Sequence, residues 1–126
     1  IGIAAAPDFT RELMWNKYSE KIKNTLKKDG VYLQFSAYND EPYKVSHGLI
    51  KDGENHILLN GPIGLDCPVR LFHGLKDTDV PSDTSGRLAD KLLSDNVIVS
   101  YNKSGNHSLS SPSDLERLKL ALVELS

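Results

Sequence analysis

Residues 67–115 decide the fold of this chain, and they read CPVRLFHGLKDTDVPSDTSGRLADKLLSDNVIVSYNKSGNHSLSSPSDL. Apolar, partly β-branched runs at 69–73 and 97–101 predict two buried strands. Leucines at helical spacing over 82–96, and again over 115–125, predict an amphipathic helix after each strand. This order of strand, helix, strand and helix predicts an α/β fold in which the two strands are adjacent and parallel.

Side chains capable of acid–base chemistry fall in the loops that follow these two strands. Asp77 and Asp79 come after the first strand, and His107 comes after the second. The carboxyl ends of neighbouring parallel strands meet at one edge of a sheet, where ligands bind in α/β proteins. We therefore expect an aspartate to lie against His107 and to orient an imidazole that removes a proton from a nucleophile.

The nucleophile itself is not evident in the sequence. In hydrolases built on such sheets it precedes the acid and the histidine, in a G-x-S-x-G turn between a strand and a helix. No serine of this chain has that context; Ser46 comes nearest, with Gly48 but no preceding glycine. Cys67 precedes a proline and opens a strand, so we expect it to be a buried packing residue.

The first 30 residues predict one more strand and one helix. Residues 1–5 are apolar and predict a short buried strand. Residues 9–30 carry apolar side chains mostly three or four positions apart, which predicts a single amphipathic helix. Asp8 or Thr10 is suited to cap this helix, and Gly30 to end it.

The middle of the chain predicts a hairpin and a second helix. Residues 31–38 and 43–45 are strand-like, and the turn formers at 39–42 lie between them. Residues 46–60 predict a helix that its glycines weaken. Residues 61–68 predict a linker to the strand that precedes Asp77.

Two motifs resemble the C-terminal segment of serine α/β-hydrolases. They are H-G-x-x-D-x-x-V-P at 73–81 and G-x-H-x-L at 105–109, and IAAAPDFT with LMW near the start is also similar to this family. The resemblance is to the subgroup that contains abhydrolase domain-containing protein 10 and its bacterial relatives. It implies that Asp77 is the acid of a catalytic triad and His107 its histidine.

The resemblance also implies a division of the chain and an activity. Residues 1–7 would be a core strand, 8–65 a lid insertion, and 66–126 two βα units of a parallel sheet flanked by helices. The implied function is hydrolysis of esters or thioesters by a Ser-Asp-His triad without a cofactor. We expect the nucleophile serine to lie in the N-terminal half of the same protein, so that the isolated chain is inactive and is the C-terminal part of an enzyme.

Three alternatives compete with this interpretation. The chain could act as a truncated or interaction domain without catalysis. Asp79 could be the acid, although the motif favours Asp77. A zinc site could form from the four histidines, although the sequence has no H-E-x-x-H or comparable paired spacing.

The composition excludes several classes of partner. The chain has 126 residues and a net charge of −2, which gives no electrostatic footprint for nucleic acid. No apolar run approaches the roughly 20 residues that a membrane helix needs. One cysteine cannot form an internal disulfide. We expect a cytoplasmic location and, as partners, a small ester or thioester and the N-terminal half of the protein.

Overall fold

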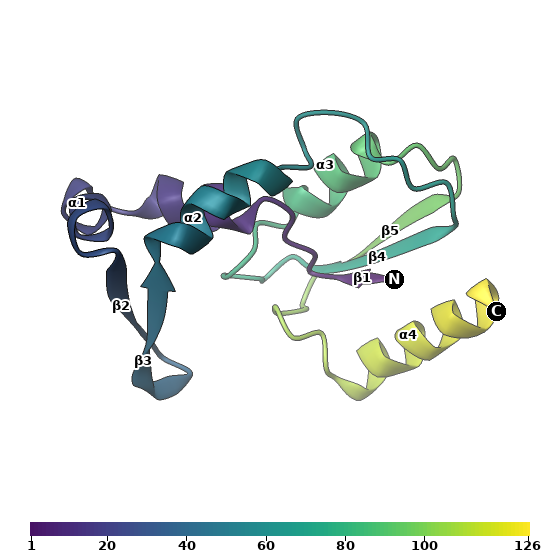
Figure 1. Ribbon diagram of the computed structural model, residues 1–126. Coiled ribbons are helices and arrows are strands. Elements are labelled where there is room, and N and C mark those ends of the chain that lie inside the picture. The colour runs from purple at the N-terminus through teal and green to yellow at the C-terminus, as the bar shows by residue number, and fades with distance from the viewer. The chain divides into compact units, whose positions relative to one another are not determined.

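The computed structural model describes all 126 residues, which form two compact units. The first unit comprises residues 1–7 and 58–126, and the second comprises residues 8–57 (Figure 1). The second unit is a continuous insertion between the first strand and the rest of the sheet.

A parallel sheet of three strands forms the centre of the first unit. The strands are β1 (Gly2–Ile3), β4 (Val69–Gly74) and β5 (Val97–Asn102), in the order β1-β4-β5. Strands β4 and β5 pair in parallel along their whole length, from Val69 opposite Val97 to Gly74 opposite Asn102. The predicted pair of adjacent parallel strands is therefore confirmed. The carboxyl ends of both strands lie side by side at the same end of the sheet.

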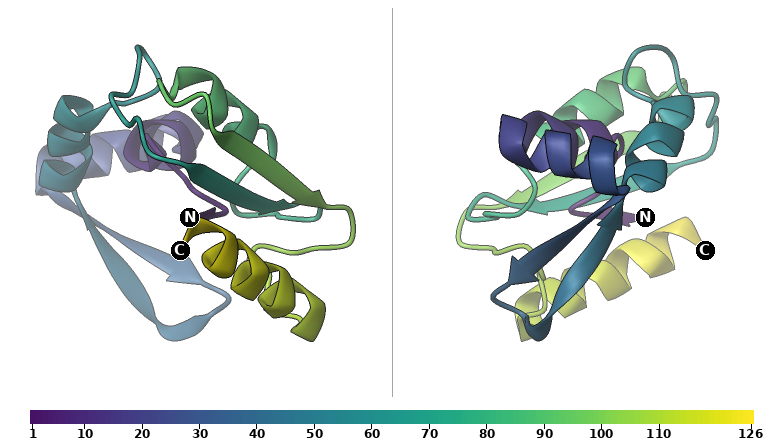
Figure 2. Two further views of the ribbon diagram at one scale, coloured as in Figure 1. Left: turned by 90° about the vertical axis from the view of Figure 1, so that its right-hand side faces the viewer. Right: turned by 60° about the vertical axis from the view of Figure 1, so that its left-hand side comes forward.

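Two helices cover opposite faces of this sheet, α3 (Asp83–Lys91) and α4 (Pro112–Leu125) (Figures 1 and 2). Helix α3 ends before the predicted residue 96, because Leu92 is extended and forms a bridge with Ile63. Helix α4 begins at Pro112, three residues before the predicted residue 115, because the Ser111 hydroxyl caps it by accepting from the Asp114 N–H. The predicted α/β class, a parallel sheet flanked by helices, is confirmed.

Side-chain bonds attach α4 to the sheet. Arg70 is buried on β4 and forms an ion pair with Glu124 at 2.5 Å, and it also donates to the Asn96 side chain. At the other end of the helix, Asn102 of β5 donates to Asp114 at 2.7 Å. Helix α4 is therefore fixed near both of its ends, although much of its outer face remains exposed.

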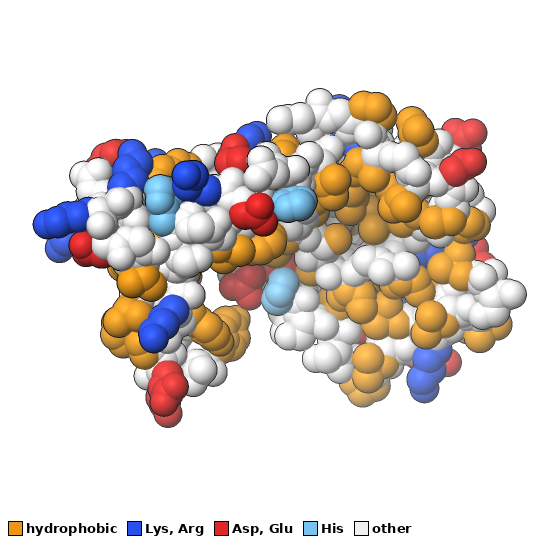
Figure 3. All heavy atoms as spheres, viewed as in Figure 1, with side chains coloured by type: hydrophobic (Ala, Val, Ile, Leu, Met, Phe, Trp, Pro, Cys, Tyr) orange, Lys and Arg blue, Asp and Glu red, His pale blue; other side chains and the backbone are white.

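Two expectations about this unit are wrong. Cys67 is exposed, because the linker that contains it runs outside the sheet and residue 69 is the first of the strand. Strand β1 comprises two residues, since Ala4 adopts a positive φ of 45° that ends the extended backbone. Figure 3 shows hydrophobic side chains exposed on one face of this unit. Ile1 and Ile3, at or next to β1, are among its exposed hydrophobic residues.

The second unit begins with two short helical turns, η1 (Thr10–Met14) and η2 (Trp15–Lys17), followed by α1 (Glu20–Asp29). The single helix predicted over residues 9–30 is therefore wrong. Tyr18 is extended, and the Ser19 hydroxyl accepts from Ile22 N–H and starts a new helix. The N-cap position of η1 is Phe9 and not the expected Asp8 or Thr10, whereas Gly30 ends α1 in the left-handed conformation, as predicted.

A hairpin and another short helix complete the second unit. Strands β2 (Val31–Ser36) and β3 (Asn39–Ser46) are joined at residues 37–38, so the turn predicted at 39–42 is misplaced. Pro42, which has no N–H to donate, lies within β3 at an irregularity of the pairing. The helix predicted over 46–60 is shorter, consisting of α2 (His47–Gly53) and η3 (Glu54–His56).

The core of the second unit is small and apolar. Leu26, Val45 and Ile50 are buried together, one each from α1, β3 and α2. Partly buried side chains that pack against them are those of Met14, Trp15, Tyr18, Ile22 and Tyr32. Trp15 and Met14 therefore serve packing inside this unit.

Candidate active site

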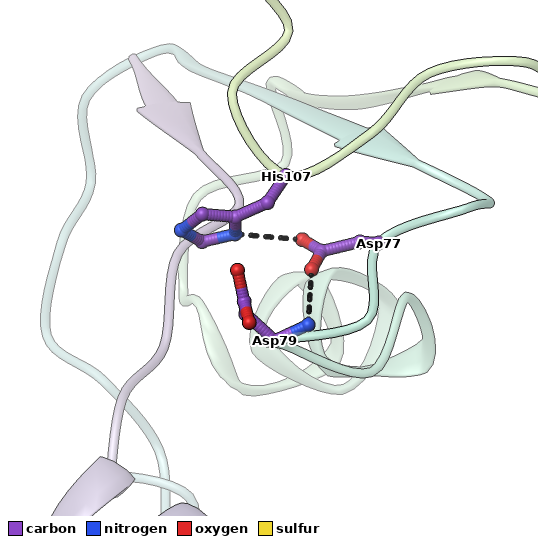
Figure 4. A group of neighbouring side chains, drawn as sticks. All are labelled: Asp77, Asp79 and His107. Carbon is purple, nitrogen blue, oxygen red and sulfur yellow. Dashed lines mark hydrogen bonds and ion pairs between the residues drawn. The ribbon is translucent and has the colours of Figure 1, made fainter. Parts of the chain in front are cut away.

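The Asp77 carboxylate lies in the loop after β4 and accepts hydrogen bonds on both of its oxygens. Oδ1 accepts from the backbone N–H groups of Asp79 and Val80, at 2.8 and 2.9 Å. Oδ2 lies 2.9 Å from Nδ1 of His107 (Figure 4). The Asp77 side chain is fully covered, whereas the His107 ring is 44% exposed. The structure therefore brings together the two residues that the motifs single out, 30 positions apart in the chain.

The protonation of Asp77 reflects these donors. Burial by itself raises the pKa of the carboxyl, but the Val80 N–H, His107 and the Asp79 N–H all stabilise the carboxylate. Their combined effect holds the pKa of Asp77 below its ordinary value. Asp77 is consequently a carboxylate at neutral pH, and it accepts the Nδ1 proton of His107. Figure 4 shows the imidazole directing its other nitrogen, Nε2, away from Asp77.

A turn held by Asn106 and Leu109 presents the His107 side chain. The Asn106 side-chain oxygen accepts from the N–H groups of Ser108 and Leu109, at 3.1 and 3.2 Å. Leu109 is buried and has a positive φ of 43°, which is a strained conformation for leucine. The buried leucine anchors the turn, and this explains the last position of G-x-H-x-L in physical terms.

Two glycines allow the loops of Asp77 and His107 to touch. A Cβ on Gly74 would lie 2.3 Å from the carbonyl oxygen of Gly105, and a Cβ on Gly105 would lie 2.6 Å from the Leu109 side chain. Lys76 N–H donates to the same Gly105 oxygen at 2.9 Å. Gly74 is the last residue of β4 and precedes the turn, and its φ is not positive, so a left-handed backbone is not the reason for glycine here. It permits close backbone approach instead.

His73 is a residue of this site whose contacts the sequence did not reveal. Its ring is fully buried at the end of β4. Nδ1 lies 2.6 Å from the hydroxyl of Ser85 on α3, and Nε2 lies 3.1 Å from the Val80 carbonyl oxygen. Nε2 is also 3.2 Å from Oδ2 of Asp77. The available signal in the sequence was a titratable side chain at the end of a predicted buried strand.

Asp77, Asp79 and His107 also form the one group of three side chains close enough to share a metal ion, with ligand atoms within 4.8 Å of one another. This group contains a single histidine, unlike the zinc site considered from the sequence. Both oxygens of Asp77 already accept N–H groups, which would compete with a cation. The geometry therefore favours hydrogen bonding between an acid and an imidazole over metal coordination.

Other residues considered from the sequence are occupied elsewhere. The Ser46 hydroxyl caps α2 by accepting from Leu49 N–H at 3.0 Å, so it serves local structure. His56 lies 3.4 Å from Asp52 on the surface of the second unit. His47 stacks against Trp15, with their ring centroids 6.3 Å apart. Asp79 is exposed and lies beside the His107 ring in Figure 4.

Comparison with known proteins identifies relatives over the whole chain, although no protein-family model matches it. The chain is 36% identical to human mitochondrial palmitoyl-protein thioesterase ABHD10 over 126 residues. Identity is 35% to the mitochondrial ABHD10 of Pongo abelii and 34% to that of Bos taurus. Each match covers 99% of this chain and 41% of the relative. The chain therefore spans about two fifths of the length of these relatives.

Solved structures give the same result. A candidate hydrolase from Agrobacterium vitis S4 has a TM-score of 0.91 and 32% identity, and the match covers 98% of this chain and 47% of that one. Mouse α/β-hydrolase domain-containing protein 10 has a TM-score of 0.82 and 32% identity, covering 98% of this chain and 50% of that one. The resemblance to the C-terminal part of α/β-hydrolases is thus confirmed.

None of the helices is long and apolar enough to cross a membrane.

Proposed function

Because the chain has the fold of the C-terminal part of an α/β-hydrolase, we propose that the protein containing it hydrolyses esters or thioesters through a Ser-Asp-His triad. The observation that carries this proposal is the hydrogen bond between Asp77 Oδ2 and His107 Nδ1, made by a covered carboxylate and a partly exposed imidazole. Asp77 is the triad acid, and His107 is the general base.

The chemistry follows from this geometry. Asp77 holds the proton of His107 on Nδ1, so that Nε2 is free to accept the proton of a serine hydroxyl. The serine oxygen attacks the acyl carbon, and the thiolate or alkoxide leaves with the proton that His107 returns. A water molecule then gives its proton to His107 and attacks the acyl-enzyme, which releases the carboxylic acid and the serine. The Asp77 charge stabilises the imidazolium during both steps.

The serine lies, in this proposal, in the N-terminal half of the same protein. The support is that this chain matches only part of its relatives: 41% of the length of human ABHD10 and 47% of the Agrobacterium protein. The free edge of β1, where Ile3 is 44% exposed, is the place where further strands would pair. Residues 8–65 would then be the lid insertion, and residues 66–126 supply the acid and the histidine.

A thioester is the substrate class that the relatives favour. The human, Pongo abelii and Bos taurus proteins are named palmitoyl-protein thioesterases, and they are also named as mitochondrial. We extend the thioester class to this protein. These names do not support the cytoplasmic location expected from composition, which stays a prediction.

The experiment that tests the function compares the full-length protein with its His107→Ala variant. We expect His107→Ala to lower the kcat for p-nitrophenyl acetate and for palmitoyl-coenzyme A hydrolysis by about 10³-fold or more. Equal activity of the two proteins would contradict the proposal. A fluorophosphonate probe should label the full-length protein on serine and leave the isolated 126-residue chain unlabelled. Labelling of the isolated chain would mean that it contains its own nucleophile.

A further inference from the structure

The Asp77 carboxylate has a second imidazole beside it, on the side opposite the solvent. His107 approaches Oδ2 at 2.9 Å from the surface, and His73 approaches the same oxygen at 3.2 Å from the interior. The His73 ring is fully buried, and Ser85, which contacts its Nδ1, is 1% exposed. The structure therefore contains a buried Ser85–His73–Asp77 arrangement next to the Asp77–His107 pair.

This buried arrangement is not a second catalytic triad. A substrate cannot reach a serine hydroxyl that is 1% exposed. Ser85 also lies in the first turn of α3, which follows a loop, and not in a sharp turn at the end of a strand. Any role of these three side chains is therefore structural, through the position of the loop that carries Asp77.

The hydrogen-bond partners of His73 determine where its proton lies. Nε2 faces the Val80 carbonyl oxygen at 3.1 Å, and a carbonyl oxygen only accepts, so Nε2 carries the proton. Nδ1 then accepts from the Ser85 hydroxyl at 2.6 Å. All polar atoms of the ring are satisfied by this tautomer without burial of another charge.

His73 contacts Asp77 directly and is also connected to it through Val80. The Nε2–H group donates to the carbonyl of Val80, and the N–H of the same residue donates to Asp77 Oδ1 at 2.9 Å. Nε2 itself also lies 3.2 Å from Oδ2 of Asp77. Ser85 of α3 supplies the hydrogen bond to Nδ1 that this tautomer needs. The ring thus connects the helix, the end of β4 and the loop that carries Asp77.

We propose that His73 is a positioning residue for the triad acid: held by Ser85, it fixes the 77–80 loop and keeps the Asp77 carboxylate in the orientation that His107 requires. This inference rests on the proposed hydrolase function. It assigns the H of the H-G-x-x-D motif to catalysis through Asp77, and not only to packing.

The test uses the full-length protein and separates positioning from folding. His73→Leu removes both ring nitrogens, whereas His73→Gln keeps an N–H donor near the position of Nε2. We expect His73→Leu to lower kcat for p-nitrophenyl acetate by about 30-fold with KM nearly unchanged, since a displaced catalytic group loses up to about 10²-fold. His73→Gln should recover most of that loss, although both variants lower the Tm. Equal kcat in folded His73→Leu and wild type would overturn the proposal.

A double variant distinguishes this inference from the function on which it rests. If His73 acts through Asp77 and His107, adding His73→Leu to His107→Ala causes no further loss of kcat. Losses that multiply would show an effect independent of the triad and would overturn the proposal. An active His107→Ala single variant would instead contradict the proposed function itself.

Ser85→Ala gives a milder variant in case His73→Leu fails to fold. It removes the hydroxyl that hydrogen-bonds Nδ1 of His73, and we expect kcat to fall about threefold, as for the loss of one neutral hydrogen bond. Ser94→Ala is the matched control, because Ser94 is also buried but its hydroxyl accepts from Asn96 N–H, away from the site. An unchanged kcat in Ser85→Ala, or an equal fall in Ser94→Ala, would overturn the proposal.

Discussion

A conservative substitution can remove the charge of Asp77. Asp77→Asn keeps the size of the side chain but places a neutral amide against His107 Nδ1. Without the carboxylate, His107 loses the group that fixes its tautomer and stabilises its imidazolium. We predict that kcat of the full-length protein for p-nitrophenyl acetate falls by about 10⁴-fold, the size of the loss known for a triad aspartate.

Asp79→Asn is the matched control for this substitution. Asp79 contributes its backbone N–H to Asp77, and asparagine retains that group. We therefore expect the loss of kcat to stay below about tenfold, in keeping with the small effect of exposed charges. A larger loss in Asp79→Asn than in Asp77→Asn would identify Asp79 as the acid, which was the alternative left open by the sequence.

The lowered pKa of Asp77 also predicts how stability depends on pH. A carboxyl whose pKa is lower in the folded state than in the unfolded chain binds its proton more weakly when folded. It contributes its full stabilisation above the unfolded pKa of about 3.9, and this contribution is lost as pH falls through the folded pKa. Urea unfolding of full-length wild type and Asp77→Asn should differ most above about pH 5, and the difference should shrink steadily below about pH 4. A difference that grows on acidification would contradict the assigned direction.

At the scale of elements, the approach of two loops depends on Gly74. Alanine at this position would place Cβ 2.3 Å from the Gly105 carbonyl oxygen, a backbone atom that cannot rotate away. We predict that Gly74→Ala lowers the free energy of unfolding by about 1–3 kcal/mol, as for an overpacked site, and also lowers kcat because the His107 loop is displaced. Urea unfolding and p-nitrophenyl acetate hydrolysis by the full-length protein measure the two effects.

Gly61→Ala provides the control for the loss of glycine itself. A Cβ on Gly61 meets no atom within 4 Å, and its φ is not positive. The substitution should leave kcat unchanged and the free energy of unfolding equal or raised by less than about 1 kcal/mol. If Gly74→Ala behaved like Gly61→Ala, the close contact between the loops would not hold in solution.

The elements that the sequence predicts well are those with a strong local pattern. Strands β4 and β5 are apolar runs followed by turn formers, and the alternation with helices implies that they pair in parallel. The break between η2 and α1 was not predicted, because apolar spacing continues across Tyr18 while the Ser19 hydroxyl starts a new helix. The hairpin turn was misplaced for a similar reason: residues 39–42 have turn chemistry but pair within β3.

The same distinction applies to the site. Asp77 and His107 could be placed together from the topology, because parallel neighbours end at one edge of the sheet. The contacts of His73 with Ser85 and Val80, and the approach of Gly74 to Gly105, depend on how a helix and two loops pack in three dimensions. No periodicity in the sequence reports such contacts, which is why they became visible only in the structure.

At the scale of the whole molecule, the sheet of the first unit has three strands and therefore two edges. The edge at β5 is formed by six residues, whereas β1 contributes two residues with Ile3 exposed. If the N-terminal half of the protein supplies further strands, they pair at β1, because the proposed serine must precede this strand in the chain. When the N-terminal half is absent, we therefore expect the unpaired edge at β1 to pair with a strand of another molecule.

The isolated 126-residue chain should accordingly associate with itself through β1. An unpaired edge with exposed apolar side chains is a template for strand pairing, and a lysine on such an edge opposes pairing because its charge must be desolvated. Ile3 and Ile98 of β5 are similarly exposed, at 44% and 48%, so Ile3→Lys and Ile98→Lys form a matched pair. We predict that sedimentation velocity finds concentration-dependent association in the wild-type chain and in Ile98→Lys, and a largely monomeric Ile3→Lys. The opposite result for the two variants would place the associating edge at β5, and the proposed position of the N-terminal half would then be wrong.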